Sequence, residues 1–188
     1  MVSDFQDKSN SSSGQNLLLW FNIILLVFIW FVAISSYGGL PARIPTHFNF
    51  AGKPDAWGNK SIFSFFLLPA VQTVLVVLIL WLRKYPYLYN FPHKGEVRKW
   101  PEQYSRPVYG FLKKFMLILA FLLNVMFIYI QFITINSARI GELGGLAGPI
   151  LILLIIIWIP LLVYLIIKIN RIVKAQRQLM KQHEAAAS

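Results

Sequence analysis

Residues 62–82 read IFSFFLLPAVQTVLVVLILWL, a stretch without a single charged side chain. A helix rises about 1.5 Å per residue, so about 20 apolar residues cross the hydrocarbon core of a bilayer, which is about 30 Å thick. Three other stretches have the same character, at residues 17–34, 115–135 and 146–167. Backbone groups in lipid need internal hydrogen-bond partners, and these runs are too long for barrel strands. The sequence therefore predicts four transmembrane helices.

The composition of the whole chain agrees with this prediction. Of its 188 residues, 57% are hydrophobic and only 13% are charged, which is outside the usual range of a soluble globular domain. The chain has no cysteine, which excludes disulfides, thiolate nucleophiles and cysteine metal sites. The predicted fold class is an all-α integral membrane protein, a four-helix transmembrane bundle with a small structured extracellular loop between its first two helices.

The positions of the basic residues predict the orientation of the bundle. Cytoplasmic loops retain an excess of lysine and arginine. With the N-terminus inside, only Arg43, Lys53, Lys60 and Arg139 of the 18 basic residues lie outside. The first apolar run is longer than the core of a signal peptide, and only Lys8 precedes it as a positive charge, so it is expected to remain as an anchor. The chain is expected to be a multi-pass plasma-membrane protein with both termini in the cytoplasm.

The remaining segments divide by composition. Residues 1–16, which include a run of serines, are expected to form a disordered cytoplasmic tail, because they offer little apolar surface to bury. Residues 17–167 form the membrane domain, with an outer cap at 36–61, a cytoplasmic loop at 83–114 and a tight glycine-rich outer loop before the last span. Residues 168–188 form a basic amphipathic tail. Topology accounts for the net charge of +11, and no nucleic-acid-binding motif accompanies it, so no nucleic-acid partner is expected.

The cytoplasmic side has two candidate contact surfaces. Residues 168–182 contain neither glycine nor proline, and as a helix they would separate an apolar face from a basic face. Such a helix is expected either to lie on anionic headgroups or to extend into solvent. The aromatic and basic loop 83–114 is expected to anchor at the interface or to dock a cytoplasmic protein, with His93 an interfacial residue without a ligand. The candidate lipid or partner contacts are Lys94, Arg98, Lys99, Arg171, Lys174, Arg177 and Lys181.

The outer loop is the most informative segment. Residues 40–60 read LPARIPTHFNFAGKPDAWGNK, in which prolines restrict the entry, Gly52 and Pro54 mark a turn, and polar and apolar residues alternate as in a short strand. These features predict a compact cap or hairpin, followed by a second helix whose N-terminus is capped by Asn59 or Ser61. Its candidate ligand-binding residues are His47, Asn49, Asp55, Trp57 and Lys60.

This loop resembles a membrane domain of unknown function found at the N-terminus of SdpI-type immunity proteins. The pattern L-P-x-x-I-P-x-H-F-N-x-x-G-x-P-D-x-W-G-x-K is matched throughout residues 40–60, and Asn90, Pro92 and Lys94 resemble a cytoplasmic segment of the same family. The resemblance covers about the first three spans. It implies a bacterial plasma-membrane protein concerned with immunity to a secreted peptide or with signalling. SdpI-type proteins carry a second membrane module, to which nothing in this chain is similar.

His47 and Asp55 allow several interpretations. A histidine beside a carboxylate is typical of acid–base or metal chemistry, but a zinc site needs three or four ligands, and a triad with Ser61 lacks an oxyanion feature. No catalytic residue, metal or cofactor is therefore assigned. The alternatives are that His47, Asp55 and Lys60 hydrogen-bond to one another and hold the cap together, or that they recognise an extracellular ligand.

Four amide side chains lie within the predicted spans. An unpaired amide in lipid is costly, so these side chains are expected to face other helices and to join them by hydrogen bonds. They are Asn22, Gln72, Asn124 and Gln131. Pro69 and Pro160 are expected to kink their helices, which transporters exploit and ordinary bundles tolerate.

The sequence favours a non-enzymatic membrane protein that recognises an extracellular peptide or envelope ligand in an immunity or signalling role. Two alternatives stay open. One is a small transport or membrane-assembly component, and the other is a membrane enzyme that uses His47 and Asp55. The expected partners are the lipid bilayer with its anionic headgroups, an extracellular peptide and a cytoplasmic protein.

Overall fold

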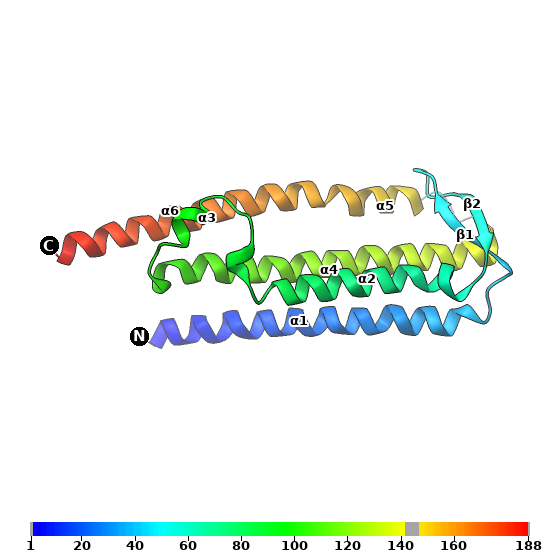
Figure 1. Ribbon diagram of the computed structural model, residues 1–188, viewed down its shortest axis with the longest axis horizontal. Helices are drawn as coiled ribbons and strands as arrows, with labels where there is room; N and C mark the ends of the chain where they lie inside the picture. The colour runs from blue at the N-terminus through cyan, green and yellow to red at the C-terminus, as the bar shows by residue number, and fades with distance from the viewer. Residues whose placement is uncertain (1, 142–146, 188) are drawn as a thin grey trace.

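Long, roughly parallel helices and a small β-hairpin make up the computed structural model, which describes residues 2–141 and 147–187 (Figure 1). Helix α1 (Val2–Tyr37) leads into strands β1 (Arg43–Phe48) and β2 (Pro54–Asn59) and then into α2 (Ile62–Leu82). A 3-10 turn, η1 (Pro86–Leu88), and the short helix α3 (Lys94–Val97) precede α4 (Glu102–Ile140). The chain ends with α5 (Ala147–Ile156) and α6 (Trp158–Ala187).

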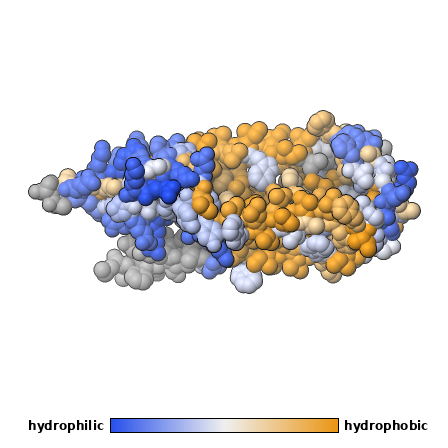
Figure 2. Space-filling model, viewed as in Figure 1, coloured by the Kyte–Doolittle hydropathy of each residue, from blue (hydrophilic) through white to orange (hydrophobic). Residues whose placement is uncertain are grey.

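Four helical segments are long and apolar enough to cross a membrane, as the sequence predicts. They are Ser13–Tyr37, Ile62–Leu82, Glu102–Ile140 and Gly148–Ala186, the last made of α5 and α6. On the face shown in Figure 2, apolar side chains form a broad band over the middle of the molecule, and hydrophilic residues gather at the two ends. This surface identifies a multi-pass membrane protein, because only lipid solvates such a band favourably.

The two ends of the bundle differ. Both chain termini lie at one end, here called the terminal end, and the β-hairpin lies at the other, the hairpin end (Figure 1). The sequence predicts a cap between the first two membrane helices. In the structure, this cap is a two-stranded hairpin.

The helices extend beyond the predicted spans. Helix α1 begins at Val2 rather than near Leu17, so its backbone runs through residues 2–16, which the sequence assigns to a disordered tail. No proline interrupts this segment, and a helix that has already formed adds residues at much less cost than a new one. Helix α4 begins at Glu102 and ends before Gly141, whose φ of 84° suits glycine.

The fourth span is not one continuous helix. The helix is interrupted at Ile157, three residues before Pro160. Proline has no N–H group to bond the carbonyl four residues earlier, which here belongs to Ile156. The interruption thus lies beside Pro160, where the sequence predicts a kink, and backbone hydrogen bonds from Ile157 to Leu153 and from Leu161 to Ile157 continue across it. Residues 142–146, which contain most of the predicted glycine-rich outer loop, lie outside the described residues.

The hairpin is an antiparallel pair with an irregular register. Arg43 pairs with Asn59 at the open end and Phe48 with Pro54 near the turn, with register shifts on either side of His47. The Asn49 side-chain oxygen accepts hydrogen bonds from the N–H groups of Ala51 and Lys53, both at 3.0 Å, and thereby shapes the turn.

Apolar packing and one lysine fasten the hairpin to the bundle. Ile44 is buried against Phe65 of α2 and Ile135 of α4. The Lys60 ammonium donates to the Leu40 carbonyl at 2.7 Å and to the Tyr37 carbonyl at 3.4 Å, at the C-terminal end of α1. A cation at this end of a helix is favourable because the free carbonyls there carry partial negative charge.

At the terminal end, the segment between α2 and α4 folds over α6. Phe91 and Val97 of this segment are buried with Val108 of α4 and with Ile169 and Val173 of α6. From the sequence, the apolar face of the C-terminal helix is expected to lie at the membrane interface or in solvent. In the structure, Ile169 and Val173 of this face pack against protein instead.

Candidate functional site

A groove lies beneath the hairpin, between α2 and α4. Its volume is about 570 Å³, within the usual range of small-molecule sites. Helix α2 contributes Leu68 and its neighbours, and α4 contributes Phe127, Ile130 and Thr134. Strand β1 roofs the groove with Pro45 and adjacent residues. Two neighbouring segments of the chain, β1 and α2, and the more distant α4 thus line it.

Gln131 is the most polar side chain that lines the groove. It is 1% exposed, and neither its amide nitrogen nor its amide oxygen has a hydrogen-bond partner among residues 2–141 and 147–187. The neighbouring Thr134 hydroxyl, by contrast, donates to the Ile130 carbonyl at 2.8 Å. A buried amide without partners costs about 1–3 kcal/mol, so Gln131 lowers the stability of the groove wall in which it is buried.

The groove opens on the lipid-facing surface of the bundle. Phe63, Leu67 and Val71 of α2 line it and are themselves exposed. They follow one another at intervals of four residues and so form a stripe along one side of the helix. An occupant can therefore enter the groove sideways from the bilayer.

The other three intramembrane amides are joined to one another. Asn124 accepts from the Gln72 amide at 2.6 Å and donates to the Asn22 side-chain oxygen at 2.9 Å. Asn22 donates in turn to the carbonyls of Leu18 and Leu117. These amides are fully buried at 0% exposure, and they link α1, α2 and α4. Gln131, seven residues after Asn124, takes no part in this network.

The hairpin candidates do not converge on the groove. His47 Nδ1 lies 2.5 Å from Asp55 Oδ1, with side chains 68% and 43% exposed, so that the pair stands in solvent. Asn49 is engaged in the turn and Lys60 in the bonds to α1. Trp57 is half-buried opposite Pro45, and its carbonyl accepts from Arg43 at 3.2 Å.

Two observations bear on the enzymatic interpretation of the hairpin. The Ser61 hydroxyl accepts from the Ser64 N–H at 3.0 Å and forms the N-cap of α2, so it serves the helix rather than the His47–Asp55 pair. Among the described residues, no group of three histidine, aspartate or glutamate side chains is placed to hold a metal ion. The hairpin geometry thus brings together a surface pair and no third group.

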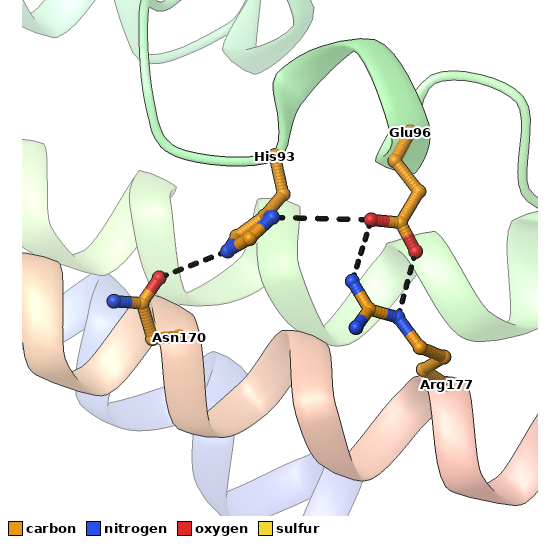
Figure 3. Close-up of polar contacts among 4 residues, drawn as sticks. All are labelled: His93, Glu96, Asn170 and Arg177. Atoms are coloured by element: carbon orange, nitrogen blue, oxygen red, sulfur yellow. Dashed lines mark hydrogen bonds and ion pairs between the residues drawn. The ribbon is translucent and has the colours of Figure 1, made fainter.

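Polar contacts hold α6 to the segment between α2 and α4 (Figure 3). Arg177 donates to both carboxylate oxygens of Glu96, at 2.9 and 2.7 Å. This hydrogen-bonded arginine lowers the pKa of the Glu96 carboxyl below its ordinary value of 4.5. Further along, Tyr104 and His183 are 2.7 Å apart.

His93 has a different role from the one that the sequence indicates. Rather than standing alone at an interface, it places Nε2 at 3.1 Å from the Asn170 side-chain oxygen and Nδ1 at 3.9 Å from Glu96 (Figure 3). Its backbone adopts the left-handed conformation, with φ at 66°. Glu96 is the only acid in the basic stretch 83–101, which is the signal in the sequence that an ion pair forms there.

The basic contact candidates at the terminal end divide into two groups. Arg177 pairs with Glu96, and the Lys94 ammonium donates to the Leu88 carbonyl at 3.3 Å. The other five residues are exposed, namely Arg98, Lys99, Arg171, Lys174 and Lys181. Nearby, Tyr89 donates its hydroxyl to the Leu82 carbonyl, and burial raises its pKa to about 12.

The hairpin and the helices beside it match a family of unknown activity. Residues 23–73 match the family described as "Domain of unknown function (DUF1648)". The matched stretch runs from α1 through the hairpin into α2, which agrees with the domain of unknown function that the outer loop resembles. The chain is also 28% identical to an uncharacterized protein of Archaeoglobus fulgidus over 167 residues, covering 78% of this chain and 83% of the archaeal protein. No solved structure matches the chain.

Proposed function

We propose that this chain is a non-enzymatic membrane protein that recognises an envelope ligand or extracellular peptide in the groove beneath its hairpin. The observation that carries the proposal is the groove itself, with a volume of about 570 Å³ and the unpartnered amide of Gln131 in its wall. Mostly apolar walls with few polar groups are typical of small-molecule binding sites.

The charge distribution supports an outward-facing groove. The basic residues of α3 and α6 lie at the terminal end, which the positive-inside rule assigns to the cytoplasm. The hairpin end then faces outward, where envelope ligands and secreted peptides are encountered. We place the protein in the bacterial plasma membrane and assign it an immunity or signalling role, on the resemblance of residues 40–60 to SdpI-type proteins. The archaeal relative is itself uncharacterized.

A transport or membrane-assembly role is the second candidate. The break between α5 and α6 supports it, because a joint beside Pro160 would let the outer half of the fourth span move. The Asn22–Asn124–Gln72 network favours recognition instead, since it ties the three other long helices together in mid-bundle. Water accessibility of Asn124 in a reconstituted protein would favour transport.

Filling the groove tests the proposed function. Ile130→Trp places a large side chain in the groove, and Phe132→Trp places the same residue on an exposed position of the same helix. Each variant in nanodiscs is equilibrated with an envelope lipid extract and with secreted peptides, and bound species are measured by native mass spectrometry. We expect a ligand that the unmodified protein and Phe132→Trp retain and Ile130→Trp loses. Equal retention by both variants would refute a binding role for the groove.

The orientation is tested separately, with the advantage that the chain has no cysteine. Ala56→Cys lies on the exposed hairpin, and Ala175→Cys lies on the exposed part of α6. In intact cells, a membrane-impermeant maleimide should label the first and spare the second. The reverse pattern would place the groove on the cytoplasmic side.

A further inference from the structure

We infer that the groove takes an acyl chain of a bilayer lipid, from the leaflet at the hairpin end. This inference rests on the proposed function, because it names the chemical class of ligand for the same groove. It follows from the depth of the groove in the membrane, from the state of the polar groups in its lining, and from the side on which the groove opens.

The depth of the groove matches one leaflet of the bilayer. Helix α2 has 21 residues, so at about 1.5 Å per residue it spans about 30 Å, the thickness of the hydrocarbon core. The lining runs along α2 from Phe63 to Val71 and along α4 from Phe127 to Thr134, which is about 10–12 Å at the same rise. These residues lie in the half of each helix nearest the hairpin (Figure 1). The groove therefore runs alongside the acyl chains of a single leaflet.

The polar groups in the lining have little to offer a polar occupant. The hydroxyls of Ser64 and Thr134 each donate to a backbone carbonyl of the protein itself. The Gln131 amide is buried within the wall, where an occupant cannot reach it. Below Thr46 at the roof, the described side chains of the lining thus present no free hydrogen-bond donor to an occupant.

Such a lining favours hydrocarbon over a peptide backbone. The carbonyls of an extended peptide need donors when they leave water, and unpaired carbonyls are costly in an apolar site. An acyl chain has no polar group along its length and incurs no such cost. A helical peptide pairs its own backbone groups, so the experiment has to separate it from a lipid.

The opening gives a lipid chain direct entry. The exposed stripe of Phe63, Leu67 and Val71 forms the α2 side of the groove, so the opening faces lipid. A chain can enter from the bilayer without leaving apolar surroundings, while its head group stays at the level of the roof. Lipid chains are about as apolar as the lining, so the gain on entry is van der Waals contact with both walls. The inference therefore concerns the chain and not a particular head group.

A phospholipid with a photoreactive diazirine near the end of one acyl chain tests the inference. The purified full chain is placed in nanodiscs that contain this lipid and irradiated, and the modified residues are identified by peptide mass spectrometry. We expect modification of Phe127, which lies at the deep end of the lining and is only 8% exposed. Val74 is exposed outside the lining and serves as the reference for contact with bulk lipid. The same diazirine on the head group should spare Phe127.

Tryptophan substitutions fill the groove from both of its walls. Ile130→Trp acts from α4 and Leu68→Trp from α2, so a folding defect in one variant does not decide the result. Each should abolish the modification of Phe127 and leave that of Val74 unchanged. Phe132→Trp is the matched control, because its side chain is exposed outside the lining, and it should retain both modifications.

The outcomes separate the inference from the proposed function. If modification of Phe127 survives in both groove variants, or if the head-group probe modifies Phe127 as readily as the chain probe, the inference is wrong. It is also wrong if the unmodified protein retains a secreted peptide and no lipid, and if Ile130→Trp loses that peptide, but the proposed function then stands. If neither a lipid nor a peptide is retained in a way that depends on the groove, the proposed function fails as well.

Discussion

Replacing Gln131 by Met should stabilise the bundle, whereas replacing Asn124 by Leu should destabilise it. The two residues are seven apart on α4, both amides are buried, and both would be read alike in a hydropathy plot. Only Asn124 has side-chain partners, in Gln72 and Asn22. Each substitution exchanges an amide for an apolar side chain of similar size, so the difference between them reports hydrogen bonding rather than packing.

The magnitudes follow from the contacts. Hydrogen bonds between membrane helices contribute about 0.6 kcal/mol on average and up to about 1.7 kcal/mol. Asn124→Leu removes three such bonds, one from Gln72 and two to Asn22, and leaves the Gln72 donor without its partner, for a loss of about 1–3 kcal/mol. Gln131→Met removes an amide with no partner, and relief of its burial cost should add about 1 kcal/mol. The two variants should therefore differ by about 2–4 kcal/mol.

Reversible unfolding in mixed micelles, by titration with a denaturing detergent, measures this difference. Asn136→Leu is a suitable control, because the Asn136 amide donates to the Phe132 carbonyl on its own helix in an exposed hydrogen bond. Its free energy of unfolding should change by less than about 0.5 kcal/mol. If Gln131→Met lost as much stability as Asn124→Leu, the Gln131 amide would have to be paired in the native protein, and the burial cost assigned to it would be wrong.

Three further predictions concern the hairpin and the terminal end. Lys60→Met removes the bonds to the end of α1 and should destabilise the attachment of the hairpin by about 1–2 kcal/mol, which faster hydrogen exchange of the hairpin amides would reveal. Gly58→Ala would place a Cβ 2.9 Å from a facing threonine methyl and should lower stability by about 1–2 kcal/mol, whereas Gly38→Ala meets no atom within 4 Å and should be neutral in the same unfolding titration. Because the folded-state pKa of Glu96 is lowered, its pairing with Arg177 stabilises the docked α6 above pH 4.5, and this contribution is lost as the pH falls through the lowered pKa. Hydrogen exchange of α6 should show that pH dependence in the unmodified protein, and its persistence in Arg177→Gln would contradict the assignment.

The candidate site shows where reasoning from the sequence reaches its limit. The cap between the first two spans is predictable, because prolines, a turn glycine and short alternation are local signals. The partner of His47 is also foreseeable, since Asp55 lies across a tight turn. The partners of His93 and Glu96 are not, because Asn170 and Arg177 lie more than 70 residues further along the chain. No local pattern records such a contact.

The amides within the predicted spans also show what the sequence predicts and what it does not. Their presence in apolar runs implies that they face protein, and composition alone supports that expectation. Which of them find partners depends on how α1, α2 and α4 rotate and slide against one another. The Asn124 amide forms hydrogen bonds with two other amides, whereas the Gln131 amide has no hydrogen-bond partner among the described residues.

The sequence by itself determined that the chain has four helices long and apolar enough to cross a membrane, that its basic end is distinct from its hairpin end, and that an ordered cap joins the first two of these helices. These properties follow from solvation and local backbone geometry, which depend on short stretches of chain. Only the tertiary structure decided that Lys60 ties the hairpin to α1, that α6 is held by Glu96, and that a groove remains beneath β1. Such features depend on side chains from distant segments meeting in space, and neither hydropathy nor local conformation encodes those encounters.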